Sequence, residues 1–154
     1  MAQLDVRIVE MPPMRVACAH GFGANPEDQA ARKMLAFLAT KGLTFEDVQW
    51  YGFDNPCPSP GSPNYGYDVW TTVGSEIEAE GEITILEIPT RLYGVTRCMG
   101  VENITKVWQQ LGLWFEESPY KRPAHWHQCL EHLLTHPDTP YEEYIFDLHV
   151  PLAP

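Results

Sequence analysis

The stretch Val6-Arg7-Ile8-Val9-Glu10-Met11-Pro12 recurs later in the chain as Ile83-Thr84-Ile85-Leu86-Glu87-Ile88-Pro89. The two stretches share Ile, Glu and Pro at equivalent places and carry apolar residues at three more. Each has the composition of a short strand that stops at a proline, which has no N–H group to continue a ladder. A repeat at this distance predicts that one structural unit occurs twice in the chain.

The segments after these strands follow the same order in both halves. A second extended segment is predicted at 14–19 and at 91–98, each ending near a glycine before a helical pattern begins. In the first half Asn25 is the predicted N-cap, and Gly42 is the predicted stop of a helix over about 26–41.

The second predicted helix begins after Asn103 and runs to about 116. Its apolar residues recur at positions i, i+3, i+4 and i+7, which is the spacing of one helix face. These residues are Ile104, Val107, Trp108 and Leu111.

Each predicted helix is followed by two extended segments joined by a proline-rich turn. They lie at 47–53 and 65–73 in the first half, and at 125–134 and 143–151 in the second. The sequence therefore predicts an α+β fold in which two pseudo-twofold-related strand-helix-hairpin units form an antiparallel sheet, with helices on one side and a central ligand groove. The whole chain, 1–154, is expected to be a single domain with repeats at about 5–74 and 82–152.

Composition narrows the classes of function. The chain has 154 residues and a formal net charge of −11, so its surface would repel the phosphates of nucleic acid and attract cations. Four cysteines without a C-x-x-C pair favour free thiols. The sequence has neither an apolar run long enough for a membrane span nor a signal peptide, so we expect a cytoplasmic protein that binds neither membrane nor nucleic acid directly.

Two further motifs carry a resemblance to a known family. The turn Tyr51-Gly52-Phe53-Asp54-Asn55-Pro56 precedes Tyr67-Asp68-Val69, and 130–137 precedes Phe146-Asp147-Leu148-His149-Val150-Pro151. In this order the motifs resemble the GyrI-like small-molecule-binding domain, the effector-binding domain of AraC-type and MerR-type multidrug regulators. The resemblance extends from Val6 to Leu152 and implies a stand-alone sensing module.

The resemblance implies a role for Glu131, because the matching glutamate of the family pairs with cationic drugs in an aromatic pocket. Glu131 also lies in an apolar segment, where a carboxylate needs a partner or a raised pKa. The alternative is that Glu131 points to solvent, as alternate residues of a strand do.

Aromatic residues provide the rest of the predicted site. Aromatic faces attract cations and flat molecules, although core packing is the alternative role for each residue. In the repeat Trp50 aligns with Glu131 and Trp70 with His149, which suggests that both tryptophans line the same groove. The five tryptophans also include Trp126. The predicted ligand-binding residues are Glu131, Trp70, Trp50, Tyr93, Trp108, Trp114, Phe146 and His149.

Two other functions stay open. A hydrolase of cyclopropane-containing cytotoxic compounds, known among GyrI-like proteins, would use Glu131 as general base, with Glu142, Glu143 or His149 as second polar group. A module that inhibits a partner enzyme by protein interaction, or that acts with a regulatory protein, is also compatible with the acidic surface. His125, His127, His132 and His136 with Cys129 lack the spacing of a zinc site, so neither metal nor cofactor is expected.

Overall fold

The structure is a computed structural model that describes residues 4–57, 59–125 and 127–154. Three short 3-10 turns accompany the helices and strands: η1 (Phe45–Asp47), η2 (Val101–Asn103) and η3 (Tyr141–Glu143). The strands and helices are β1 (Arg7–Met11), β2 (Met14–Gly23), α1 (Pro26–Thr40), β3 (Trp50–Asp54), β4 (Tyr65–Thr72), β5 (Thr84–Ile88), β6 (Arg91–Met99), α2 (Ile104–Glu117), β7 (Leu130–Leu133) and β8 (Ile145–Leu152). Helices combined with antiparallel strands confirm the predicted α+β class.

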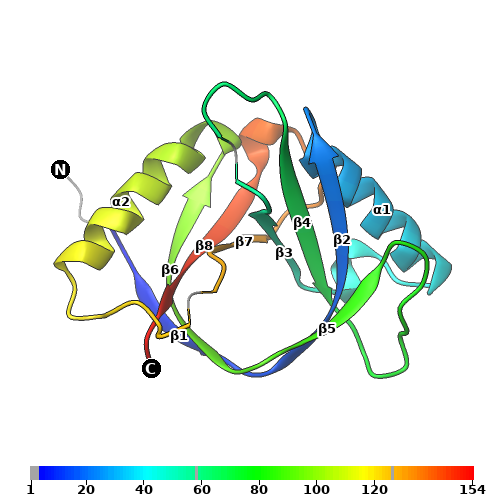
Figure 1. Ribbon diagram of the computed structural model, residues 1–154, viewed down its shortest axis with the longest axis horizontal. Helices are drawn as coiled ribbons and strands as arrows, with labels where there is room; N and C mark the ends of the chain where they lie inside the picture. Colours follow the sequence, from blue (N-terminus) through cyan, green and yellow to red (C-terminus); the bar gives the residue numbers. More distant parts are fainter. Residues whose placement is uncertain (1–3, 58, 126) are drawn as a thin grey trace. The chain divides into compact units, whose positions relative to one another are not determined.

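The chain divides into two compact units, which we describe separately. Unit 1 contains the chain up to Pro13 together with Pro89–Pro154, and unit 2 contains Met14–Ile88. In unit 1 the strands pair in the order β1-β6-β8-β7, and α2 lies against β6 and β8 (Figure 1). The sheet is buried along most of β8, where only Ile145 is partly exposed.

Unit 2 has the same plan. Its strands pair in the order β3-β4-β2-β5, and α1 packs against β2 and β4 (Figure 1). The hydroxyl of Thr71 in β4 lies 3.3 Å from the sulfur of Met34 in α1, which identifies the face of this sheet that the helix covers. The residues of α1 that are buried are Pro26, Ala30, Ala31, Met34, Phe37 and Leu38.

The first strand of each predicted repeat pairs with a strand of the other repeat. β1 pairs with β6, and β5 pairs with β2, so each unit contains one strand from the other half of the sequence. The repeat in the sequence and the compact unit in space are therefore different divisions of the chain. The pseudo-twofold relation and the groove between the halves stay predictions.

The helix boundaries agree with the sequence, although their caps differ from those expected. Asn25 and Asn103 occupy the N-cap positions, but neither side chain makes a capping hydrogen bond. The Asn103 amide donates instead to the carbonyl of Met99 at 2.8 Å. Gly42 has a φ of 73°, a left-handed conformation that terminates α1 and that suits glycine.

The prediction of one extended segment over 125–134 is wrong in its first half. Only Leu130–Leu133 form a strand, and His125 and residues 127–129 lie outside the ladder. Trp126 lies outside the described residues. No helix of the described chain is both long and apolar enough to cross a membrane.

Candidate functional site

The position of Glu131 follows from the pairing of three strands in unit 1. A Cβ built at Gly94 would approach the Trp114 ring of α2, so the Gly94 position faces this helix. Gly94 lies opposite Val150 of β8, and Glu131 lies opposite Leu148 of β8. Val150 and Leu148 are two residues apart in this strand. Because residues of one strand alternate between faces and opposed residues share a face, Glu131 lies on the side that α2 covers. We call this side the helix face of unit 1.

Side-chain contacts agree with this assignment. The indole Nε1 of Trp108, in α2, donates to the Glu131 carboxylate at 3.4 Å, a long hydrogen bond. Glu131 is half-buried, and its charge, after burial, helps to raise the pKa of the Cys98 thiol in β6. Glu131 is therefore not the solvent-facing residue of the alternative interpretation, since its side chain lies near α2.

Helix α2 is packed much less completely than α1. Of its residues only Leu111 is buried, at 0% exposure, and the rest of its apolar stripe is half-buried. The half-buried apolar residues are Ile104, Val107, Trp108, Trp114 and Phe115. An apolar stripe that faces a carboxylate and is not fully covered by its own unit provides surface that a ligand can bury.

Gly94 permits the close approach of α2 to the sheet, which gives a testable prediction. In Gly94→Ala the new Cβ would lie 2.9 Å from Trp114 Cζ3 and 3.3 Å from Val150 Cγ1, so the Trp114 ring must move. We expect the free energy of unfolding to fall by about 1 to 3 kcal/mol. Urea unfolding, with near-ultraviolet circular dichroism for the tryptophan environment, measures both effects.

Gly112→Ala is the matched control, because a Cβ at this position of α2 meets nothing within 4 Å. Alanine is the better helix former by about 1 kcal/mol, so this variant should be as stable as the parent or more stable. A Gly94→Ala protein with unchanged stability and spectrum would contradict the predicted contact.

Two of the predicted site residues lie on the opposite side of the unit 1 sheet, which we call the far face. Tyr93 lies one residue from Gly94 in β6, and His149 lies one residue from Leu148 in β8, so both point away from α2. Their rings contact edge-to-face at 5.2 Å, and Tyr93 contacts His127 in the same way at 5.5 Å. The structure thus separates Tyr93 and His149 from Glu131.

The far face also has a charged cluster that the sequence pattern did not reveal. The Asp147 carboxylate accepts from Arg97 at 2.6 Å and from Arg7 at 3.1 Å. Burial favours a higher pKa for Asp147, but these two guanidinium groups outweigh it and lower the pKa below its usual value. Arg7 lies in β1, Arg97 in β6 and Asp147 in β8, so no pattern within one strand could have predicted this cluster.

Phe146 joins the helix face, where it lies opposite Cys98 and Leu133. It is buried, and its ring contacts Tyr144 at 5.6 Å. Of the predicted site residues, therefore, Glu131, Trp108, Trp114 and Phe146 share one face of one unit.

Trp50 and Trp70 belong to unit 2, where both are buried. Trp70 contacts Phe53 edge-to-face at 4.9 Å, and Trp50 contacts Phe45 at 5.7 Å. These contacts agree with core packing, and a ligand-binding role for either tryptophan stays a prediction.

The pairing register corrects the predicted equivalence of Trp50 and Glu131. In unit 2 Tyr51 lies opposite Trp70, and in unit 1 Leu130 lies opposite His149. Since Trp70 and His149 are equivalent in the repeat, the counterpart of Glu131 is Gly52. A Cβ at Gly52 would collide with the Tyr67 ring, so the place of the Glu131 side chain is taken by this tyrosine in unit 2.

Unit 2 has a second polar cluster around Asp68, on the face of its sheet away from α1. The Asp68 carboxylate pairs with His20 and accepts from the Asn55 amide at 3.0 Å. Burial and the charge of Asp68 raise the pKa of the neighbouring Cys18 thiol to about 11. Cys18 is consequently protonated near neutral pH and is a poor nucleophile.

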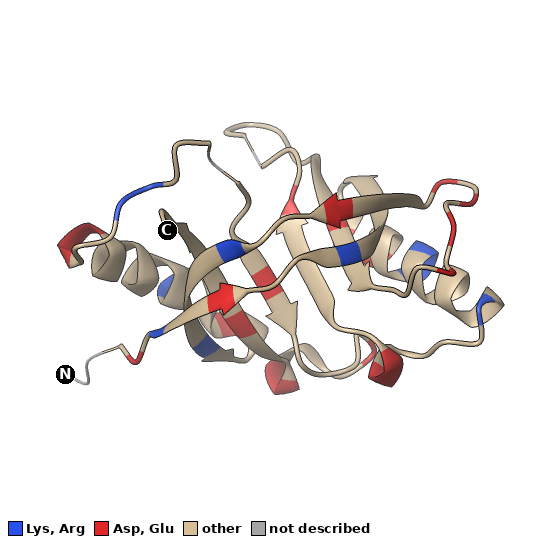
Figure 2. Ribbon diagram, turned by 90° about the horizontal axis from the view of Figure 1, so that it is seen from below, with Lys and Arg blue, Asp and Glu red and all other residues tan. Residues whose placement is uncertain are grey.

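Basic residues are scattered among more numerous acidic ones on both units (Figure 2). Among the described residues no group of three His, Cys, Asp or Glu side chains could hold a metal ion. The candidates for a hydrolytic partner of Glu131 are also dispersed. Glu142 and Glu143 are exposed in η3, and His149 lies on the far face.

The sequence of this chain matches a class of effector-binding domains. Within this class the chain belongs to the Cass2 family of integron-associated effector-binding proteins, whose model matches residues 7–152. The predicted resemblance to the GyrI-like domain is confirmed, and a small-molecule-binding role goes with the family.

Solved structures of low sequence identity share the fold. The EcmrR C-terminal domain is 13% identical, with a TM-score of 0.72 and 97% of both chains covered. The EcmrR chain in a complex with DNA is 14% identical, with a TM-score of 0.72. The match covers 97% of the present chain but only 57% of the EcmrR chain.

Two further structures that share the fold are those of a hydrolase and of a ligand complex. A hydrolase from Listeria innocua is 10% identical, with a TM-score of 0.66 and coverage of 99% of this chain and 94% of the other. SAV2435, solved with bound tetraphenylphosphonium, is 11% identical, with a TM-score of 0.57 and coverage of 97% and 94%. No curated protein sequence shows significant similarity to this chain.

Proposed function

We propose that the chain binds small hydrophobic, often cationic molecules on the helix face of unit 1. Glu131 is the counter-ion of the ligand, and Trp108 and Trp114 are the aromatic surfaces beside it. The observation that carries the proposal is the incomplete packing of α2 over a half-buried carboxylate.

The chemistry of this face suits a lipophilic cation. A half-buried carboxylate is stabilised by an opposite charge close to it, and each aromatic face adds about 0.5 to 2 kcal/mol of cation–π attraction. The apolar stripe of α2 can bury the hydrocarbon part of the same ligand. The tetraphenylphosphonium bound to SAV2435, a protein of the same fold, is a molecule of this kind.

The proposed site uses only part of the residues predicted from the sequence. Tyr93 and His149 lie on the far face, so they have no place in it. Phe146 supports the site from the sheet, where it is buried opposite Cys98.

Tetraphenylphosphonium tests the proposal directly. We expect its titration to quench the fluorescence of Trp108 and Trp114. Glu131→Gln should weaken its affinity by roughly tenfold or more, because the half-buried counter-ion is lost. Neutral triphenylphosphine oxide, which keeps the aromatic groups, should bind the parent and Glu131→Gln proteins equally. Fluorescence titration and calorimetry measure these affinities.

Glu116→Gln is the control, since it removes an equal charge from an exposed position of α2. Its affinity for tetraphenylphosphonium should stay close to that of the parent. If Glu116→Gln and Glu131→Gln weaken binding equally, general acidity rather than the Glu131 site attracts the cation, and the proposal fails.

Binding is favoured over hydrolysis by the position of the second polar groups. General base catalysis through Glu131 needs an acid or a second base within hydrogen-bond reach of the substrate. The three groups predicted for this role lie in η3 or on the far face. A cyclopropane-containing compound should accordingly be bound without turnover beyond one equivalent, which product analysis can establish.

A further inference from the structure

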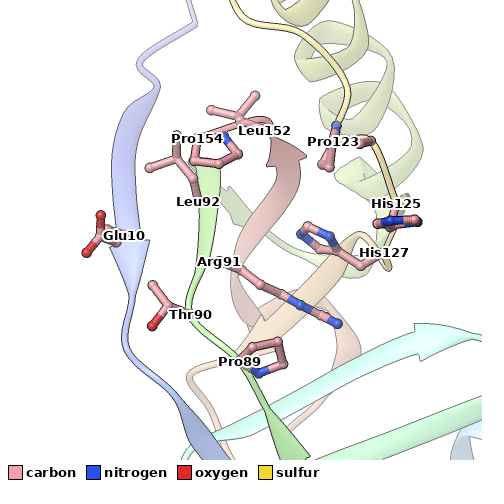
Figure 3. Close-up of a pocket in the computed structure, with 11 residues that line it drawn as sticks. Glu10, Pro89, Thr90, Arg91, Leu92, Pro123, His125, His127, Leu152 and Pro154 are labelled. Carbon is pink, nitrogen blue, oxygen red and sulfur yellow. The ribbon is translucent and has the colours of Figure 1, made fainter.

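Unit 1 contains a hollow that is distinct from the surface around Glu131. It has a volume of about 390 Å³ and lies where β6 begins and β8 ends (Figure 3). Much of its wall is apolar and rigid, because it includes three prolines and two leucines. These residues are Pro89, Pro123, Pro154, Leu92 and Leu152.

The polar part of the wall is basic. Figure 3 shows the side chains of Arg91 and His127 next to one another, with His125 beyond them. Arg91 donates to the side-chain oxygen of Gln128 at 3.3 Å, a neutral partner that leaves the guanidinium charge uncompensated by that contact. The carboxylate of Glu10, also in the wall, points away from Arg91.

His127 presents a polar atom that its own unit does not satisfy. Its Nε2 is buried and has no hydrogen-bond partner among the described residues. A buried nitrogen without a partner costs about 1 to 3 kcal/mol, and a ligand oxygen at this place would recover it when the ring is protonated at Nε2. Burial and the charge of Arg91 lower the pKa of this ring, and a bound anion would oppose both effects.

We propose that this cavity binds a carboxylate attached to an apolar body. The carboxylate accepts from the Arg91 guanidinium and, once the ring has taken up a proton, also from His127 Nε2. The apolar body lies against the prolines and leucines. One guanidinium and one histidine supply the charge and donors that a single carboxylate needs, whereas a doubly charged phosphate would need more. The site takes ligands of opposite charge to those proposed for Glu131.

The acidic net charge of the chain means that an anion binds only where basic side chains are close to it. A net charge of −11 disfavours the approach of any anion, so binding of a carboxylate requires a local basic site. At physiological ionic strength charges beyond about 8 Å are largely screened, and the groups that line the cavity then decide the affinity.

Calorimetry with 2-naphthoate tests this site, and 2-naphthylmethanol is the neutral probe with the same aromatic body. We expect 2-naphthoate to bind with one-to-one stoichiometry and the alcohol to bind at least about tenfold more weakly. Arg91→Gln should weaken 2-naphthoate by about tenfold, as expected for the loss of a hydrogen bond to a charged group, and Arg91→Lys should weaken it less. Circular dichroism establishes that each variant is folded.

Two control variants test whether 2-naphthoate binds in this cavity. Arg32→Gln removes the same charge from exposed α1 and should leave 2-naphthoate binding unchanged, as should Glu131→Gln. The inference is overturned if 2-naphthoate does not bind, if the acid and the alcohol bind equally, or if Arg91→Gln and Arg32→Gln have the same affinity. Because Glu131→Gln affects only the cation site, the two proposals can fail independently.

Discussion

The protein is expected to lose about 2 kcal/mol of its free energy of unfolding between about pH 7 and about pH 5, chiefly through His149. This ring is 4% exposed in β8, and burial lowers its pKa from 6.5 to about 4. Its Nδ1 lies 3.0 Å from the carbonyl oxygen of Asp147, a contact that opposes the shift only in part.

The direction follows from the number of protons that each state binds. Between pH 6.5 and about pH 4 the unfolded state protonates its histidine while the folded state keeps His149 neutral. Acidification therefore favours unfolding across this window, and the effect is complete below the folded pKa. Asp147 acts in a separate window, since its lowered pKa makes the folded state lose stability only below about 3.8.

Urea unfolding at several pH values measures the effect. Glutamine has no ionisable group, so the free energy of unfolding of His149→Gln should fall much less between about pH 7 and about pH 5 than that of the parent. The fall that remains is attributed to His127 and His132, whose pKa values are also lowered by burial. His136→Gln, at a half-buried position outside this cluster, should keep the decline of the parent. Equal pH dependence in His149→Gln and the parent would show that His149 does not control it.

Leu111→Ala should lower the free energy of unfolding by about 3 kcal/mol. Leu111 is the one buried residue of α2, and truncating a buried leucine costs about 2 to 5 kcal/mol through lost burial and the cavity left behind. Because the rest of the stripe is only half-buried, α2 should detach more easily in this variant. Urea midpoints give the stability, and hydrogen exchange of the α2 amides gives the local opening.

Leu113→Ala is the matched control two residues away, at a position that is 59% exposed. Its stability should differ from that of the parent by no more than about 0.5 kcal/mol. Similar losses in the two variants would mean that the burial of Leu111 is not the main contribution of α2 to stability.

Most secondary structure could be predicted, because it depends on signals that are local. Alternation and terminal prolines predicted β1 and β5, and the spacing of apolar residues with Pro26 and Gly42 predicted α1 within one residue of its observed end. The same signals overestimated the strand before Leu130. That part of the chain lacks a ladder partner, which is a property of the sheet and not of the residues.

The site was predicted less completely. Glu131 and Trp108 do lie near each other, and Trp114 and Phe146 share their face. Tyr93 and His149 were placed in the same pocket because they are aromatic and lie in the repeat. Composition cannot tell which face of a strand a residue takes, since a register shift by one residue exchanges the faces.

By itself the sequence determined the duplication, the α+β class and the family resemblance, because these rest on local patterns and on their order along the chain. Only the tertiary structure decided that β1 pairs with β6 and β5 with β2, so that each unit holds one strand of the other repeat. It also decided that Gly52 is the counterpart of Glu131 and that Leu111 is the one residue of α2 that is fully buried. Each of these depends on pairing register or packing between segments far apart in the chain. Such contacts are set by the shape of the whole core, which no local pattern records.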